Sequence, residues 1–142
     1  MVGQQITHYQ VQALLGQGRI GNVFQAIDLE DFSLVAIKVI FLHLMEEPGT
    51  RRRFLQEVNA IPRLEHPSIV KVHEAGIDTE QNILYLTMDY LTGRSLNSYL
   101  RQLQFNNQQL GLDDALIIVA QIAEALSYAH QKGLIHRDIR PT

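Results

Sequence analysis

The chain has 142 residues, of which 46% are hydrophobic, and its formal net charge is −3. This length and apolar content suffice for one globular domain with a buried core. The small negative charge excludes a general nucleic-acid surface, which needs a clustered basic excess. The absence of cysteine excludes a disulfide framework. No signal-type segment begins the sequence, and its longest apolar run, Ala115–Ala120, is too short for a membrane span. We therefore expect a cytoplasmic protein.

The first ninety residues predict an antiparallel sheet. Tyr9–Leu15 alternates polar and apolar side chains, and the runs Val23–Ile27 and Leu34–Phe41 are rich in β-branched residues. Two more strand-like runs, SIVKVHEAGI and ILYLTMDYL, are separated by the turn-rich DTEQN. Together these runs predict five strands.

One helix is expected between the third and fourth strands. Phe54, Val58 and Ile61 recur at the spacing of one helical face, and Pro62 should end or kink the helix. The run Arg51–Arg53 is expected to be a solvated part of this helix.

The second half of the chain predicts helices. A short helix is indicated by the apolar residues of LNSYLRQL, and a longer one runs from Asp113 to Lys132. Asp113 or Asp114 can cap its start, and Gly133 should stop it. The longer helix is apolar around much of its circumference, so it should be buried on several sides or associate with another surface. A sheet followed by helices predicts the α+β class in two parts.

Three glycines in GQGRIGNV, namely Gly16, Gly18 and Gly21, lie between the first two predicted strands. A dinucleotide-binding turn leads from a strand into a helix, whereas here a second strand follows, so that interpretation is rejected. Glycines at a hairpin tip let backbone amides approach phosphate oxygens closely. A flexible turn without a ligand is the alternative.

The strand that follows carries one lysine in the motif VAIK. On a strand, Ala36 and Lys38 share one face, and Val35 and Ile37 share the other. A lysine on a buried strand is costly unless it has an anionic partner. Glu57, at the edge of the apolar stripe of the predicted helix, is the candidate partner, and a solvated Glu57 is the alternative.

Taken in order, these motifs resemble the eukaryotic-type protein kinase family, and the serine/threonine kinases of bacterial type within it. The glycine loop, the VAIK lysine, the helix glutamate, LEHPSIVKV, LYLTMDYL, GRSL and GLIHRDIRP follow one another as in that family. The resemblance implies an incomplete protein kinase domain over residues 1–142. Its N-lobe, a five-stranded sheet with one helix, would span residues 9–90. A hinge would span residues 91–94, and the start of a helical C-lobe would span residues 95–142.

The resemblance also implies an ATP site. The positions that match ATP-binding positions of the family are Leu15, Gly16, Gly18, Gly21, Val23, Ala36, Lys38, Met88, Asp89, Leu91 and Ser95. Lys38, paired with Glu57, would bind the α- and β-phosphates, and Met88 would be the gatekeeper beside the adenine. The backbones of Asp89 and Leu91 would hydrogen-bond the adenine edge, and Ser95 matches a position where a ribose contact is common.

In the segment GLIHRDIRP, the resemblance assigns the catalytic base to Asp138 and a contact with the γ-phosphate to Arg140, where the family has lysine. Ile61, Val72 and His136 match members of a hydrophobic stack. Small-molecule phosphotransferases of the aminoglycoside kinase type are the rival within the fold. They usually carry glycine between the catalytic His and Asp, where this chain has Arg137, so a protein kinase is favoured.

The family uses ATP with Mg²⁺, and its metal ligands are an asparagine just beyond position 142 and the aspartate of a DFG triplet, which these residues do not contain. We therefore expect the chain alone to have no phosphotransfer activity, and the protein substrate is not indicated by the sequence. Alternatives are a pseudokinase-like module that binds nucleotide or a partner, with self-association through residues 113–132, and a non-functional gene remnant.

Overall fold

The computed structural model of the chain describes residues 1–18, 21–40, 64–136 and 139, and these residues form two compact units. The first unit comprises Met1–Leu64 and Val70–Leu91, and the second comprises Glu65–Ile69 and Thr92–Thr142. The predicted helix with Glu57 and Ile61 lies outside the described residues, as do Asp138 and Arg140 of the predicted catalytic loop.

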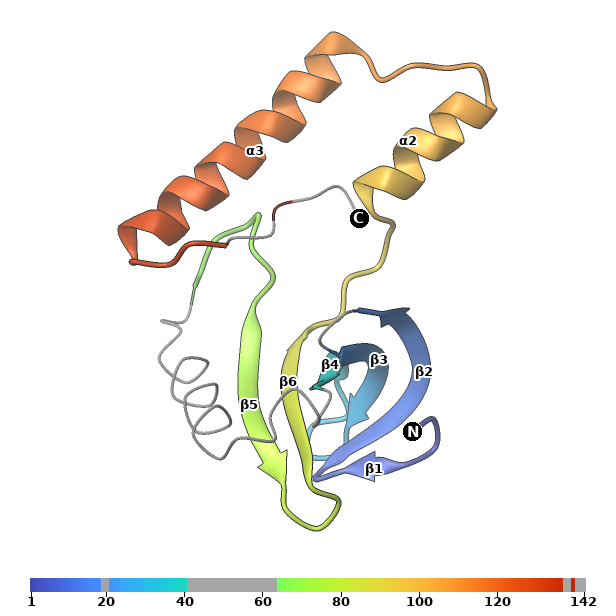
Figure 1. The fold of residues 1–142 in the computed structure, drawn as a ribbon, viewed down its shortest axis with the longest axis vertical. Helices are drawn as coiled ribbons and strands as arrows, with labels where there is room; N and C mark the ends of the chain where they lie inside the picture. Colours follow the sequence, from blue (N-terminus) through green and yellow to red (C-terminus); the bar gives the residue numbers. More distant parts are fainter. Residues whose placement is uncertain (19–20, 41–63, 137–138, 140–142) are drawn as a thin grey trace. The chain divides into compact units, whose positions relative to one another are not determined.

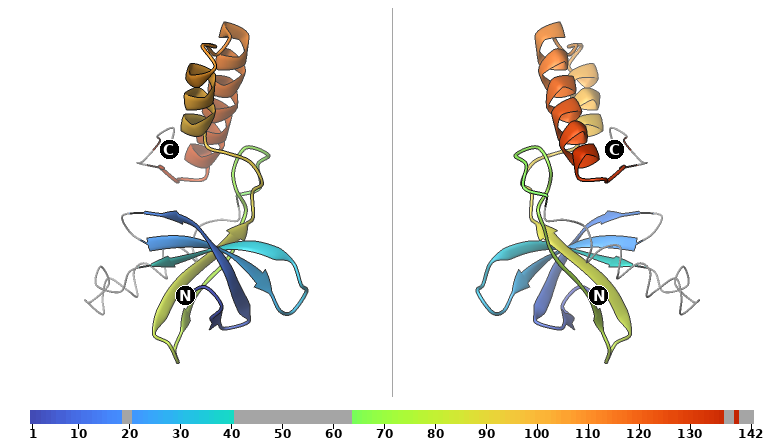
Figure 2. Two further views of the ribbon diagram at one scale, coloured as in Figure 1. Left: turned by 90° about the vertical axis from the view of Figure 1, so that its right-hand side faces the viewer. Right: turned by 90° about the vertical axis from the view of Figure 1, so that its left-hand side faces the viewer.

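The first unit is an antiparallel sheet that curls on itself (Figures 1 and 2). Its strands in sheet order are β1 (Gln5–Ile6), β2 (Tyr9–Gln17), β3 (Gly21–Asp28), β4 (Leu34–Ile40), β6 (Ile83–Asp89) and β5 (Val72–Asp78). The five predicted strands are all present. The two-residue β1 was not predicted, because so short a strand shows no alternation.

The main buried cluster of the sheet lies on one face, as strand alternation allows. Phe24 is opposite Ile37 and Ala26 is opposite Val35, and all four side chains are buried. The complete buried cluster is Ile6, Tyr9, Val11, Phe24, Ala26, Val35, Ile37 and Tyr85. Val35 and Ile37 therefore share the face of this cluster, and Ala36 and Lys38 share the other face of β4, so the predicted alternation is confirmed.

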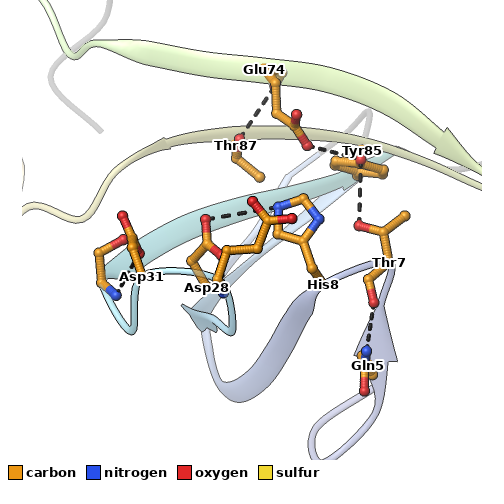
Figure 3. Close-up of polar contacts among 10 residues, drawn as sticks. Gln5, Thr7, His8, Asp28, Asp31, Glu74, Tyr85 and Thr87 are labelled. Atoms are coloured by element: carbon orange, nitrogen blue, oxygen red, sulfur yellow. Dashed lines mark hydrogen bonds and ion pairs between the residues drawn. The ribbon is translucent and has the colours of Figure 1, made fainter.

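Polar groups at the edge of this core are tied together by hydrogen bonds (Figure 3). The Tyr85 hydroxyl donates to Glu74 Oε1 at 2.9 Å, and Thr7 Oγ1 donates to the Tyr85 oxygen at 3.5 Å. Burial raises the pKa of Tyr85, so its hydroxyl stays protonated and can donate. The network joins the segment after β1 to the β5–β6 hairpin, and Thr7 and Tyr85 are 78 residues apart in the sequence.

Asp78, at the end of β5, holds the turn into β6 and the chain segment after β1. Its carboxylate accepts hydrogen bonds from the backbone N–H of Gln81 at 2.9 Å and of Thr7 at 3.0 Å. These bonds favour the charged form, so the pKa of Asp78 lies below its usual value. The side chain thus connects two segments 71 residues apart in the sequence.

This pKa shift predicts an acid-sensitive contribution to stability. A carboxyl whose pKa is lowered by folding stabilises the protein above its unfolded pKa of about 4, and this contribution is lost as the pH falls through the folded pKa. In urea unfolding, Asp78→Asn should therefore reduce stability at pH 7 and should show a smaller further loss between pH 5 and pH 3 than the unsubstituted chain. An equal loss in both proteins would contradict the assignment to Asp78.

The second unit contains α2 (Leu96–Phe105) and α3 (Leu112–Gln131), which run in opposite directions (Figures 1 and 2). The expected cap by Asp113 or Asp114 is wrong. Gly111 is the N-cap of α3 and makes no side-chain cap bond, while the two aspartates lie in the first turn. In the first turn, their negative charges still interact favourably with the positive end of the helix dipole.

The end of α3 is as predicted. Gly133 has φ +78°, its N–H donates to the carbonyl of His130, and the N–H of Leu134 donates to the carbonyl of Ala129, both at 2.9 Å. This is the Schellman arrangement, which satisfies the last carbonyls of a helix. Within the described part of the chain, no helix combines the length and the apolar content of a membrane span.

Residues 65–69 lie against the C-terminal part of α3. The Tyr128 hydroxyl accepts from the N–H of Glu65 at 3.3 Å, and the rings of His66 and Tyr128 are 5.3 Å apart. Helix α3 also has an apolar stripe that is left exposed, formed by Leu112, Leu116 and Val119, with exposed fractions of 59% to 75%. The helix is thus apolar on more than one side, as the sequence predicted.

Candidate functional site

The glycine turn joins β2 to β3, and each of its three glycines has a different environment. The N–H of Gly18 donates to the carbonyl of Gly21 at 2.9 Å, which closes the turn. A side chain at Gly21 would overlap the carbonyl oxygen of Val39 on β4 and would lie 2.9 Å from its carbonyl carbon. A side chain at Gly16 would meet nothing within 4 Å. Gly21 is therefore required by the close approach of β3 to β4, and only Gly16 has open space beside it.

Four of the predicted ATP-binding residues come together on the face of the sheet opposite the core. In the strand register, Val23 on β3 is opposite Lys38 on β4, and Ala36 on β4 is opposite Met88 on β6. Residues opposite one another in an antiparallel sheet have neighbouring side chains on the same face. Ala36 is buried, and the other three are half-buried. This face therefore presents an apolar surface with one cation.

Leu15 lies at an irregularity in β2. Leu14 pairs with Phe24 and Gly16 pairs with Val23, so Leu15 is the extra residue of a β-bulge. A bulge bends its strand and changes the direction of a side chain. Leu15 is 45% exposed. Its side chain is therefore partly open to solvent, and its predicted contact with the adenine stays a prediction.

The chain leaves the sheet through Met88, Asp89 and Leu91. The N–H of Asp89 donates to the carbonyl of Lys71 at 3.0 Å, which anchors the end of β6 to the segment before β5. Leu91 has an exposed fraction of 70%. The Asp89 side chain lies 2.9 Å from His73 Nε2. This pair could not be predicted from the sequence, because the two residues are on different strands.

Ser95 has a local structural role in the second unit. Its side-chain oxygen accepts from the N–H of Ser98 at 3.2 Å and so caps α2. The predicted ribose contact of Ser95 stays a prediction. Of the predicted hydrophobic stack, Val72 is half-buried at the start of β5 and His136 is exposed after α3.

One group of described residues could hold a cation, and the sequence did not predict it. Ligand atoms of His8, Asp28 and Glu30 all lie within 4.8 Å of one another (the His8–Asp28 pair is in Figure 3). Asp28 is already engaged, because its carboxylate accepts from the N–H of Glu30 at 2.9 Å and lies 3.8 Å from His8 Nε2. The group lies at the end of the β2–β3 hairpin remote from the glycine turn. It is thus remote from the face that carries Lys38.

Comparison with known proteins supports one family throughout. The sequence profile of the protein kinase domain matches residues 9–142. The serine/threonine-protein kinase pkn3 of Myxococcus xanthus is 37% identical over 142 residues, which is 99% of this chain and 25% of that protein. PrkC of Bacillus subtilis is 34% identical, with 99% of this chain and 21% of that protein covered. The chain thus spans about a quarter of the length of these relatives.

A solved structure agrees with the sequence comparisons. The crystal structure of the Mycobacterium tuberculosis PknI kinase domain superposes with a TM-score of 0.82 at 32% identity, covering 99% of this chain and 55% of that one. The match thus covers about half of that kinase domain, and this chain corresponds to the N-terminal part of a kinase domain. The chain therefore belongs to the protein kinase domain family, and its relatives are bacterial serine/threonine kinases.

Proposed function

We propose that this chain forms the ATP-binding part of a serine/threonine protein kinase. The whole protein would transfer the γ-phosphate of ATP to a hydroxyl group of a protein. The observation that carries the proposal is the grouping of Val23, Ala36, Lys38 and Met88 on one face of the sheet, next to the glycine turn. An apolar face suits the adenine ring, and a cation beside a glycine turn suits its phosphates.

Each predicted residue has a role in this proposal. Leu15, Val23 and Ala36 contact the adenine, with Met88 at the back. Lys38 binds the α- and β-phosphates and is positioned by Glu57. The backbone of Asp89 and Leu91 hydrogen-bonds the adenine edge, and Ser95 contacts the ribose. Because the N–H of Asp89 is bonded to Lys71, its carbonyl is the group we assign to the adenine amino group.

Phosphotransfer itself is proposed for the whole protein only. Asp138 would orient the acceptor hydroxyl and take its proton, and Arg140 would contact the γ-phosphate. Mg²⁺, when bound with the nucleotide, neutralises charge on the phosphates. The described residues bring no carboxylates together at Lys38, so we assign no metal ligand to them. For these 142 residues alone, the proposal is nucleotide binding without phosphotransfer, and the lobe boundaries at residues 9–90, 91–94 and 95–142 are part of it.

Calorimetry with Mg-ATP tests the nucleotide site. The chain should bind Mg-ATP, and Lys38→Ala should weaken binding at least about tenfold, because a direct charge-assisted contact with phosphate is lost. Lys71→Ala removes an exposed lysine from the same unit and is the matched control, which should bind as the unsubstituted chain does. A folded chain that does not bind Mg-ATP, or a Lys38→Ala variant with unchanged affinity, would overturn the proposal.

A second function, protein association through α3, is favoured by the exposed stripe of Leu112, Leu116 and Val119. Isolated apolar side chains are common on surfaces, whereas a contiguous stripe along two turns of one helix is typical of an interface. The two proposals are compatible, since one concerns the sheet and the other concerns the helix.

A further inference from the structure

Strand β5 contains a bulge beside the end of β6. Val72 pairs with Met88 and Glu74 pairs with Thr87, so His73 has no counterpart in the ladder. The bulge is thus located next to the proposed gatekeeper, Met88. Bulges turn a side chain out of the regular alternation and are frequent next to functional sites.

The extra residue is directed at Asp89, the last residue of β6, which precedes the proposed hinge of residues 91–94. His73 Nε2 lies 2.9 Å from Asp89 Oδ1, with side-chain exposures of 36% and 46%. Met88 and Asp89 are consecutive on a strand, so their side chains point to opposite faces. His73 therefore holds Asp89 from the face opposite the proposed nucleotide site and leaves the Asp89 backbone unobstructed on the other.

One further contact acts on the same residue. The Asp89 N–H is bonded to the carbonyl of Lys71, so Asp89 is held through both its backbone and its side chain by residues on either side of Val72.

We propose that His73 is a positioning residue for the nucleotide, which fixes the Asp89 backbone in place to read the adenine edge. This inference rests on the proposed ATP site and adds to it a residue on the opposite face of the sheet. Partly exposed ion pairs contribute little to overall stability. The main effect of the pair should therefore be on ligand preorganisation, since a binding segment that is already ordered loses less entropy when it binds.

The test compares Kd values for two nucleotides that differ at the base edge, Mg-ATP and Mg-ITP, by calorimetry on the 142-residue chain. His73→Ala should raise the Kd for Mg-ATP about threefold to tenfold, because the adenine-reading backbone is less ordered before binding. The Kd for Mg-ITP, which has an oxygen in place of the adenine amino group, should change little. His73→Gln keeps a donor near the Nε2 position and should restore most of the Mg-ATP affinity.

His130→Ala is the control, because it removes another exposed histidine that belongs neither to the proposed nucleotide site nor to the group of possible cation ligands. It should leave both Kd values unchanged. Amide hydrogen exchange of residues 89–91 without nucleotide provides a second readout, and His73→Ala should accelerate it.

The outcomes separate the two proposals. In one outcome, the chain binds Mg-ATP and Lys38→Ala weakens this binding. If His73→Ala then binds Mg-ATP as the unsubstituted chain does, with unchanged amide hydrogen exchange, the positioning role is overturned and the proposed ATP site stands. Equal weakening of Mg-ATP and Mg-ITP by His73→Ala, without rescue by glutamine, also overturns it, because that pattern indicates general disruption of the fold. If the unsubstituted chain does not bind Mg-ATP, both proposals fail.

Discussion

Gly21→Ala is expected to lower the free energy of unfolding by about 2 to 3 kcal/mol, because the added methyl group has no space between two paired strands. The new Cβ would overlap the carbonyl of Val39 and would lie 3.0 Å from the Cα of Ile40. Both are backbone atoms, which cannot move aside as a flexible side chain could. Strands β3 and β4 would have to separate at their ends, with loss of ladder hydrogen bonds.

Gly16→Ala is the matched control for this prediction. It adds the same methyl group to the same glycine turn, where nothing lies within 4 Å, and the glycine does not have a positive φ. Its stability should stay the same or rise by up to about 1 kcal/mol, because alanine reduces the entropy of the unfolded chain. Urea unfolding monitored by circular dichroism measures both variants. Equal destabilisation by the two substitutions would show that close packing at Gly21 is not the cause.

Replacing Leu116 and Val119 together by glutamine is expected to weaken self-association of the chain at least about tenfold, since two exposed apolar side chains of one stripe would be lost. Their exposed fractions are 59% and 62%. Glutamine is a good helix former, so α3 should be retained. Sedimentation equilibrium over a range of protein concentrations measures the change.

The control for the helix variant is Glu124→Gln with Ser127→Gln, two exposed polar positions of α3. This pair of substitutions should leave association unchanged. If the unsubstituted chain is monomeric at high concentration, or if both double variants associate equally, the stripe on α3 is not a self-association surface.

The strands and helices were largely predictable because their signals are local. Alternation along Tyr9–Leu15 and the β-branched run of VAIKVI require only the neighbouring residues in the chain, and so does glycine at position 133. The start of α3 was predicted wrongly, since Asp113 and Asp114 could each have been a cap and the choice of Gly111 depends on how the preceding loop enters the helix. The order of motifs sufficed to predict the family.

The candidate site, too, could be predicted only in part from the sequence. The sequence predicted which residue types belong to it, and alternation alone put Ala36 and Lys38 on one face. That Val23 and Met88 lie on this same face depends on the register between β3, β4 and β6. Register is fixed by hydrogen bonds and packing between strands, which pair residues as distant in the sequence as Val35 and Asp89, and local patterns do not specify it.

The sequence by itself thus determined the α+β class, the five main strands, the helical second half and membership of the kinase family, because periodicity and motif order are properties of the linear chain. Only the tertiary structure decided why Gly21 must be glycine, which distant segments Asp78 joins, and that a bulge brings His73 to Asp89. These features depend on contacts between separate segments of the chain. Such contacts exist only after the sheet has formed.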